Sequence, residues 1–434
     1  MRKVKIGELL TRIKECVNIE NDKYYKRVTI RMYHKGVCLR DIEKGENIGT
    51  KNQFLVRQGQ FIMSRIDAKS GAFGIIPNEL DGAVVTNDFL TFEVNKDLID
   101  IEYFELYSQT RAFIDFCSKG STGTTNRKRL KEELFLNFEI TIPEKSEQTE
   151  IVNKYKRFKM EYDEIQEELK HQLNLIGQLR QSILQEAVQG KLVPQDPNDE
   201  PASVLLEKIK EEKERLIKEG KIKKEKPLPP ISEDEIPYEL PEGWEWVRLG
   251  EIGETHTGTT PSTKHPEYFN GEIPFIKPAD ITDKGINYNN ESLTLLGVNK
   301  GRLIPKDSVM MVCIGGSIGK CYYTDRDCSC NQQINAITAY GNMHGKFLYY
   351  FLSSPYFYKQ VLARATGSAT PIINKNKWSN ILFPLPPLSE QKRIVEKVDQ
   401  LMDLCDELEK NIEQSKKDSE LLMQSVLQEA FKDA

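Results

Sequence analysis

The chain has 434 residues, of which 38% are hydrophobic and 29% are charged, a balance typical of soluble folded proteins. Its length exceeds what one ordinary hydrophobic core supports, so two or more domains are expected. The formal net charge of −5 argues weakly against a nucleic-acid partner. The first residues lack the apolar stretch of a secretory signal, and no run of 18 apolar residues could cross a membrane, so a cytoplasmic location is expected.

Cysteine and histidine spacing gives no sign of a metal site. The eight cysteines are scattered and none forms a Cys-x-x-Cys pair. Cys328 and Cys330 lie close together, but no second pair could complete a zinc site. The five histidines show no metal-type pairing either. We therefore expect reduced thiols and no metal.

Residues 1–145 alternate short apolar runs with turn residues. The runs at 60–66 and 83–94 are rich in Val, Ile, Phe and Thr and are bounded by Gly, Asn or Asp, which predicts strands. Residues 103–120 favour a helix with an aromatic face that ends at Gly120. This block is therefore expected to be an α+β domain.

Residues 146–190 predict a long helix that Ser146 caps. Between Ile151 and Ile183, nine of the ten positions at alternating spacings of four and three residues are apolar or aromatic. That spacing is typical of a coiled-coil seam rather than of an ordinary amphipathic helix.

A linker follows at 191–247. Its charged segment 203–220 predicts a short helix that begins at Ser203 and ends at Gly220. The segment after Gly220 contains too many prolines for a helix or a central strand. Two interpretations remain open for the linker, a flexible tether and an extended strap packed on a partner protein.

A second α+β block is predicted at 248–388, with a strand at 307–314 and an aromatic helix at 347–367. The sequence GGSIGK at 315–320 suggests a phosphate loop, but its glycine spacing is short and Cys321 replaces the required hydroxyl. We therefore predict a tight turn there. A second coiled-coil helix, with Ser389 as its cap, is predicted at 389–434.

The chain contains an internal duplication at an offset of 243 residues. QSILQEA at 181–187 matches QSVLQEA at 424–430, and the same offset relates KSEQ at 145–148 to LSEQ at 388–391. A duplicated chain predicts a pseudo-twofold molecule that meets a partner with two related halves. Because each long helix ends far from its own block, we expect the two helices to pair antiparallel.

The charge distribution follows the duplication. Residues 1–145 hold 24 Lys and Arg against 21 Asp and Glu, and residues 248–388 hold 14 against 10. Both blocks are therefore basic, and the excess of acidic residues lies in the segments between and after them. Two basic blocks favour a nucleic-acid partner more than the overall charge does.

Several segments resemble one known family. Residues 190–226 and 240–252 resemble the central region of specificity subunits of Type I restriction-modification systems. TGTTPSTKHPEYFNGEIPFIKPADI at 257–281 resembles the opening of their target recognition domains, and LSEQKRIVEKVDQLM at 388–402 resembles the start of their spacer helix. The first block departs from this pattern, because it lacks the PEGW opening, so the two blocks are expected to read different half-sites.

The resemblance implies an α+β chain in which two target recognition domains are separated by two long helices in an antiparallel coiled coil. It implies a non-catalytic reader of double-stranded DNA with an asymmetric bipartite target. It also implies two methyltransferase subunits and ATP-dependent restriction subunits as partners. No cofactor is expected in this chain, whereas the partners would use S-adenosylmethionine, ATP and Mg. A coiled-coil scaffold that binds two protein ligands without DNA remains the alternative.

No catalytic residues are predicted, since both Pro-Pro pairs lack the preceding Asn or Asp of a methyltransferase motif. Arg and Lys suit phosphate or guanine, and Asn and Gln suit adenine, so polar loop residues are the candidates for DNA contact. In the first block they are Lys51, Arg57, Ser64, Arg65, Lys69, Asn87, Thr122, Thr124, Asn126, Arg127 and Lys128. In the second block they are Thr259, Lys264, Lys277, Lys320, Gln332, Ser368, Thr370, Asn374, Lys375 and Lys377.

Overall fold

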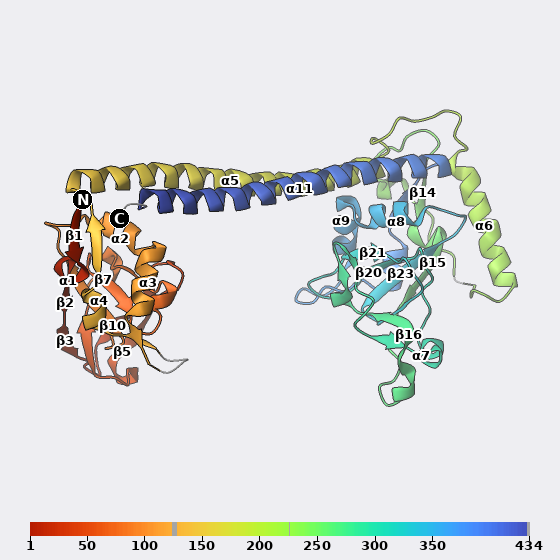
Figure 1. Cartoon of the computed structure of the whole chain (residues 1–434). Helices are drawn as coiled ribbons and strands as arrows, with labels where there is room; N and C mark the ends of the chain where they lie inside the picture. The colour runs from red at the N-terminus through yellow and green to blue at the C-terminus, as the bar shows by residue number, and fades with distance from the viewer. Residues whose placement is uncertain (124–127, 225, 432–434) are drawn as a thin grey trace. The chain divides into compact units, whose positions relative to one another are not determined.

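The computed structural model describes residues 1–123, 128–224 and 226–431 (Figure 1). The chain divides into two compact units. Unit 1 comprises Met1–Lys170 with Glu413–Ala434, and unit 2 comprises His171–Ile412. Each unit therefore contains one α+β domain together with parts of both long helices.

The domain of unit 1 is built on two antiparallel sheets. One sheet pairs the first strand of the domain with its last, so that Val4 lies opposite Ile140. The other has the strand order β2-β10-β7-β8. The strands are β1 (Arg2–Lys5), β2 (Leu10–Ile13), β7 (Phe61–Ser64), β8 (Phe73–Ile75), β10 (Phe89–Val94) and β13 (Glu139–Ile142).

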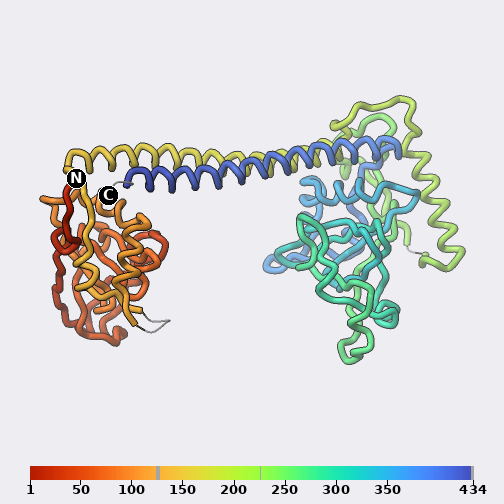
Figure 2. The backbone as a smooth tube through the Cα atoms, in the orientation of Figure 1, coloured from red at the N-terminus to blue at the C-terminus, as the bar shows by residue number. Residues whose placement is uncertain are grey.

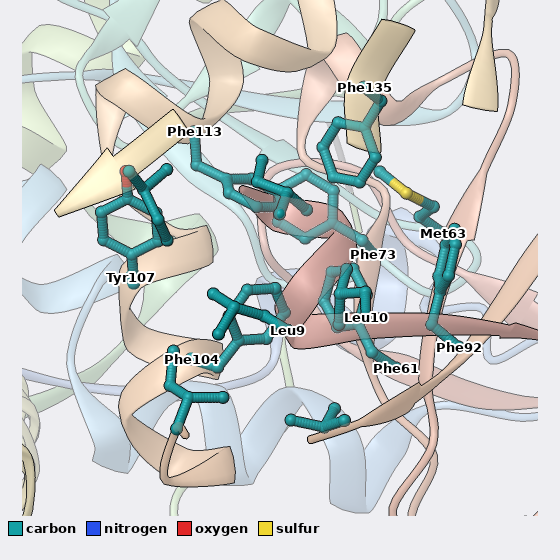
Figure 3. Packing of buried hydrophobic residues seen from close by; sticks show 14 of the residues in the cluster. Leu9, Leu10, Phe61, Met63, Phe73, Phe92, Phe104, Tyr107, Phe113 and Phe135 are labelled. Atoms are coloured by element: carbon teal, nitrogen blue, oxygen red, sulfur yellow. The ribbon is translucent and has the colours of Figure 1, made fainter. Parts of the chain in front are cut away.

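Two short helices cover this sheet where one helix was predicted. Helix α2 (Ile101–Ser108) ends before Thr110, whose hydroxyl accepts a hydrogen bond from the amide of Phe113 and begins α3 (Arg111–Lys119). The break turns the aromatic face inward, and Phe104 and Phe113 pack edge to face with Phe61 from β7 (Figure 3). All three rings are fully buried.

Unit 2 repeats this core residue by residue. Val247 lies opposite Phe383, which is the pairing of Val4 with Ile140 moved by 243 residues. The four-stranded sheet has the matching order β15-β23-β20-β21. The predicted duplication is thus confirmed in strand register. The strands are β14 (Glu245–Arg248), β15 (Gly253–Thr257), β20 (Val309–Val312), β21 (Cys321–Tyr323), β23 (Ile334–Ala339) and β24 (Leu382–Leu385).

The aromatic helix of unit 2 is also broken in two. Helix α8 (Gly345–Leu352) ends before Ser354, whose hydroxyl accepts from the amide of Phe357 at the start of α9 (Pro355–Arg364). Pro355 favours this break because proline is tolerated in the first turn of a helix but not in its interior. The prediction of a single helix was therefore wrong at equivalent places in both domains.

The two domains differ in the sheets added to the shared core. Unit 1 adds a five-stranded sheet of order β3-β6-β9-β4-β5, whereas unit 2 adds a sheet of order β19-β16-β22 and a separate β17-β18 pair. In unit 1 the strands are β3 (Glu15–Asn18), β4 (Tyr24–Ile30), β5 (Val37–Lys44), β6 (Asn52–Leu55) and β9 (Val84–Val85). In unit 2 they are β16 (Phe269–Ile276), β17 (Ile281–Thr282), β18 (Gly285–Ile286), β19 (Ser292–Leu293) and β22 (Ser329–Cys330).

The long helices are α5 (Lys145–Val188) and α11 (Leu388–Ala430). Both begin before the serines that were predicted as their caps. A buried glutamine attaches each helix to its own domain instead. Gln148 donates to the carbonyl of Pro143 at 2.8 Å, and its equivalent Gln391 donates to Pro386 at 3.1 Å.

Within each unit the two long helices run antiparallel, as predicted. In unit 1 the Gln166 side chain donates to the Ser419 hydroxyl at 2.7 Å. In unit 2 the Arg180 guanidinium contacts Asp406 at 2.5 Å and Glu409 at 3.1 Å. Residue numbers therefore rise along α5 while they fall along α11.

The linker packs on unit 2, which contradicts the interpretation as a flexible tether, while contact of the linker with a partner protein stays a prediction. Helix α6 (Ala202–Lys218) begins one residue before its predicted cap and buries Leu205 and Ile209. Glu212 accepts a hydrogen bond from the amide of Gly341 at 2.6 Å. A Cβ atom at Gly341 would lie 2.6 Å from Ile209, so only glycine permits this approach. The chain then returns toward β14 (Figure 2).

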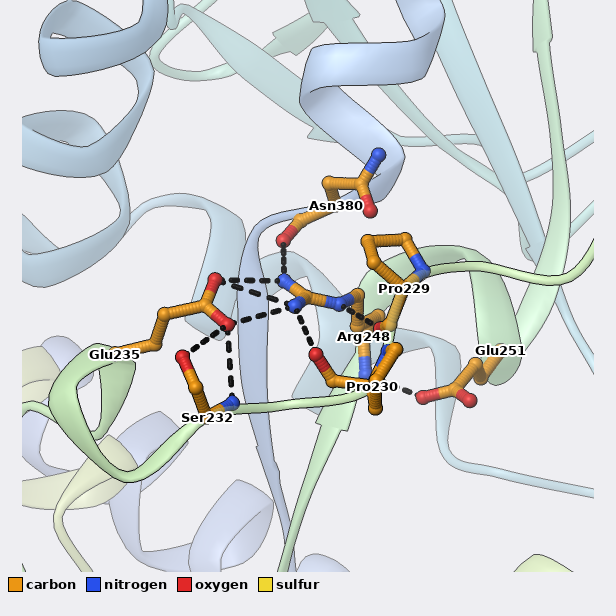
Figure 4. Close-up of polar contacts among 7 residues, drawn as sticks. All are labelled: Pro229, Pro230, Ser232, Glu235, Arg248, Glu251 and Asn380. Atoms are coloured by element: carbon orange, nitrogen blue, oxygen red, sulfur yellow. Dashed lines mark hydrogen bonds and ion pairs between the residues drawn. The ribbon is translucent and has the colours of Figure 1, made fainter.

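Arg248 holds the proline-rich part of the linker (Figure 4). Its side chain is 4% exposed and pairs with Glu235 at 2.8 Å. It also donates to the carbonyls of Pro229, Pro230 and Asn380. Hydrogen bonds from Arg248, with help from the amide of Ser232, lower the pKa of Glu235 to about 2. One arginine thus joins the linker to β14 and to the end of the second domain.

We expect Arg248→Ala to destabilise unit 2 by about 3 kcal/mol, because breaking a buried ion pair leaves its partners unsatisfied. Chemical unfolding of the full chain measures this loss. Since the folded pKa of Glu235 is below its ordinary value of about 4.3, the contribution of the pair is present above that pH and is lost as the pH falls toward 2. The variant should therefore lose less stability than the wild type between those pH values.

Arg27→Ala is the matched control, since Arg27 forms a more exposed pair with Asp41 in unit 1. Surface pairs contribute about 1 kcal/mol or less. Equal losses for Arg248→Ala and Arg27→Ala would contradict the assigned role of Arg248.

Candidate nucleic-acid interface

Three segments of unit 1 meet where β7 ends and β10 begins. Ser64 lies opposite Phe89 in the sheet, and the amide of Arg65 donates to the carbonyl of Asp88 at 2.8 Å. The amide of Leu130 donates to the carbonyl of Arg65 at 2.8 Å, which ties in the hairpin of β11 (Ser121–Thr122) and β12 (Arg129–Leu130). We call residues 65, 87–88, 121–123 and 128–130 the loop corner of unit 1.

This corner gathers basic side chains beside two carboxylates. Arg65 donates to the carbonyl of Asn87 at 3.0 Å and lies 3.5 Å from Glu132. Arg129 pairs with Asp88 at 3.1 Å and remains 58% exposed, and Lys128 is exposed. Exposed arginine and lysine side chains can contact phosphates or guanine edges.

Unit 2 has the equivalent corner. The amide of Cys313 donates to the carbonyl of Gln333 at 2.8 Å, and the amide of Ile373 donates to the carbonyl of Cys313 at 3.0 Å. These bonds correspond to the Arg65–Asp88 and Leu130–Arg65 bonds of unit 1. Residues 313–315, 331–333 and 366–373 form the loop corner of unit 2. Thr260 also reaches it, since its hydroxyl donates to the Gln332 amide oxygen at 2.6 Å.

The structure places part of the predicted DNA-contacting set at these corners. Asn87, Thr122 and Lys128 are exposed at the corner of unit 1, and Arg65 is half-buried there. At the corner of unit 2 the exposed members are Gln332, Ser368 and Thr370, with Thr259 adjacent. Lys264 and Lys320 lie on other loops, and Lys69 lies in a short 3-10 helix. The roles of all these residues stay predictions.

Other members of the predicted set have structural partners. Ser64 is 7% exposed, and its hydroxyl accepts from the amides of Ile66 and Asp67, so it caps its own turn. Asn374 begins helix α10 (Lys375–Ser379) by accepting from the amide of Lys377 at 2.9 Å. In both residues the short polar side chain already makes local hydrogen bonds to the backbone, and their contact with DNA stays a prediction.

Several predicted lysines and arginines are engaged within the chain. Lys51 donates to the carbonyl of Gly45 at 2.6 Å, and Lys377 donates to that of Arg364 at 3.0 Å. Arg57 pairs with Glu15, and Lys277 pairs with Glu291. Lys375 lines a cavity together with residues of β15. Thr124, Asn126 and Arg127 lie outside the described residues.

Sequence reasoning missed Arg12. Its side chain is 10% exposed and lies 3.5 Å from Glu132, the same carboxylate that Arg65 approaches. It donates to the carbonyls of Ile13 and Thr91, both at 2.7 Å, and burial lowers the pKa of the guanidinium. Arg12 thus anchors Glu132 beneath the corner. No local sequence pattern marks it, because its partners are distant in the chain.

Within residues 1–123, 128–224 and 226–431, no three His, Cys, Asp or Glu side chains converge as a metal site. All eight cysteines are free thiols. In GGSIGK the amide of Ile318 donates to the carbonyl of Gly315, and both Gly315 and Gly319 have positive φ, so this segment is the predicted tight turn. None of the described helices is apolar over a length that would span a bilayer.

Comparison with known proteins agrees with this architecture. The family model described as Type I restriction modification DNA specificity domain matches residues 1–175 and 241–415. The specificity subunit of the EcoAI Type I restriction enzyme from Escherichia coli is 29% identical over 415 residues, covering 84% of this chain and 69% of the relative. The EcoEI specificity subunit from the same species is 37% identical over 195 residues, covering 36% of this chain and 33% of the relative.

Two solved structures share the fold. One, from a study of complex assembly and conformational transition of the type I R-M system, has a TM-score of 0.66 at 18% identity, covering 99% of this chain and 97% of that one. The HsdS subunit from Thermoanaerobacter tengcongensis has a TM-score of 0.57 at 19% identity, covering 100% and 96%. The duplicated α+β core on long helices is therefore that of a DNA specificity protein. The chain belongs to the family of Type I restriction-modification specificity subunits.

Proposed function

We propose that this chain reads an asymmetric bipartite DNA target on behalf of a Type I restriction-modification complex and catalyses no step itself. The observation that carries the proposal is the pairing of a shared core with different added sheets. Equivalent loop corners can present equivalent kinds of contact, while different surrounding sheets can select different bases. Each domain would then read its own half-site.

The remaining chemistry is assigned to partners. Two methyltransferase subunits would supply the S-adenosylmethionine chemistry, and restriction subunits would use ATP and Mg. The complex would work in the cytoplasm, where its DNA is accessible. The coiled-coil scaffold that binds no DNA is the competing function, and DNA binding separates the two.

We expect the assembled methyltransferase complex to bind its target with an affinity that falls steeply as salt rises, because phosphate contacts release counterions. If Lys128 contacts a phosphate, Lys128→Ala should weaken binding to all DNA sequences alike. It should also lower the slope of the logarithm of the binding constant against the logarithm of the salt concentration by about one. Fluorescence anisotropy at several salt concentrations measures this slope. Lys170→Ala, on an exposed face of α5, is the control. A scaffold would show no salt-dependent binding, and an unaltered Lys128→Ala slope would remove Lys128 from the interface.

Exposed apolar residues on the long helices support a count of two methyltransferase subunits. In unit 1 Ile165 is 47% and Leu422 is 62% exposed, and in unit 2 Leu408 is 48% and Leu179 is 46% exposed. The offset of 243 relates Ile165 to Leu408 and Leu179 to Leu422. All four lie at positions predicted for the coiled-coil seam, but the structure leaves them exposed. Each unit therefore exposes the same apolar pair, and exposed apolar patches mark interaction sites.

Native mass spectrometry of the saturated complex should show two methyltransferase subunits for one copy of this chain. The double variant Ile165→Glu/Leu422→Glu should retain only one, because a buried charge without a partner opposes docking. The same change at Leu179 and Leu408 should remove the other. A wild-type ratio of one to one, or two subunits retained by a double variant, would contradict this assignment.

A further inference from the structure

A cavity of about 480 Å³ lies in unit 2 between the linker and the shared core. The first part of β15, from Gly253 to His256, lines it and is called its floor here, and Lys213 of α6 lines it with residues 221–223 of the linker. Arg302, Leu303 and Pro305 also line it, together with Lys375 from α10. The duplication does not produce this cavity, since the linker that walls it occurs once in the chain.

The lining of the cavity is strongly basic. Lys213, Lys221, Lys223, Arg302 and Lys375 all face it, against the single carboxylate of Glu254. Lys213, Lys221 and Lys375 also have interactions within the chain. Lys213 donates to the carbonyl of Gly250 at 3.4 Å, and Lys221 pairs with Glu219 at 2.8 Å. Such an excess of cations attracts a ligand that carries more than one negative charge.

His256 is an independent sign of an incomplete site. The residue is 3% exposed, yet neither ring nitrogen has a hydrogen-bond partner among the residues that the structure describes. Buried polar groups are normally paired, and an orphaned one calls for a ligand or an explanation. Burial, with the nearby charges of Arg302 and Lys375, lowers the pKa of His256 to about 3, so the ring is neutral near pH 7 and can donate one hydrogen bond.

We propose that this cavity binds a small phosphate-bearing ligand of mononucleotide size. Arg302 and Lys375 supply the charge opposite the phosphate groups, and Lys213 supplies charge from the linker side. His256 donates a hydrogen bond from the floor. Phosphate oxygens suit this set because they accept several charge-assisted hydrogen bonds at once.

The dimensions favour a free ligand over a DNA duplex. A duplex is far wider than a cavity of about 480 Å³ and could reach only its rim. Because the linker forms one wall, the bound ligand would also hold α6 and residues 221–223 against the core. Binding should therefore stabilise the packing of the linker on unit 2.

Pyrophosphate and ADP are the probes for calorimetric titration of the full chain at low salt. We expect saturable binding at one site, and Arg302→Ala should weaken it at least tenfold. Arg302 is exposed, and among the residues that the structure describes its side chain forms no hydrogen bond or ion pair. Its backbone carbonyl accepts from the Ser329 hydroxyl at 2.7 Å, which the substitution keeps, so the variant should fold. Lys306→Ala removes an exposed positive charge four residues away, outside the cavity lining, and should bind like the wild type.

A second measurement reports on the floor of the cavity. With the five histidines labelled, pyrophosphate should shift the His256 ring resonance and raise its pKa, and the His256→Gln variant identifies the signal. Absence of saturation, or equal weakening by Arg302→Ala and Lys306→Ala, would overturn the proposal. So would displacement of pyrophosphate by duplex DNA together with loss of DNA affinity in Arg302→Ala, which would assign the cavity to the DNA backbone.

Discussion

Exchange of residues 1–145 for the corresponding block of another family member is expected to change one half of the methylated motif completely and to leave the other half unaltered. The added five-stranded sheet belongs to the domain of unit 1 alone, whereas the domain of unit 2 has its own sheets and its own loop corner. The bases that one domain contacts should therefore be set by the residues of that domain and not by those of the other. Methylome sequencing of a host that carries the assembled methyltransferase measures the motif.

The contacts of α5 and α11 define how the exchange must be made. Gln148 accepts from the amide of Asp100 at 2.7 Å and donates to Pro143 at 2.8 Å, so the donor block must present both groups. Phe431, directly after α11, packs on Tyr103 and Tyr107, with ring centroids 5.1 and 5.7 Å apart. A donor with small residues there would fail to fold rather than test specificity. Exchange of 248–388 is the reciprocal control, and a change in both halves from either exchange would refute independent reading.

Lengthening both long helices by one heptad is expected to lengthen the unspecified gap of the target by about three base pairs. Seven helical residues add about 10.5 Å, and each base pair adds about 3.4 Å. Insertions after Leu169 and after Ile412 lie inside α5 and α11, and they keep the apolar positions in phase. The half-site sequences should be unaffected, because neither domain is altered.

The same experiment has a matched control. Insertion into only one helix puts the Gln166–Ser419 contact and the Arg180–Asp406 contact out of a common register, so it should lower stability and activity. The added residues would also rotate the two domains around the DNA duplex, so the double variant should bind DNA more weakly. Methylome sequencing again decides, and an active double variant that still modifies the original spacing would show that the helices do not set the gap.

The sequence alone determined the duplication, the α+β character of each block and the antiparallel helices. These features follow from local periodicity and from a repeated register, and both can be read directly from the order of the residues. The strand pairings Val4–Ile140 and Val247–Phe383 are related by the same offset of 243, so the repeat seen in the sequence is also present in the strand register. The tight turn at 315–320 was predictable for the same reason, because glycine spacing is a local property.

Only the tertiary structure decided the helix breaks at Thr110 and Ser354, the docking of the linker and the fate of individual polar side chains. The local hydrogen bonds of the Ser64 hydroxyl, for example, depend on how residues 64–67 turn and are not visible in the residue type alone. Arg248, Arg12 and His256 depend on partners that are distant in the sequence and converge only after folding. Desolvation and long-range pairing determine what each of these side chains does, and neither is encoded in a residue's immediate neighbours.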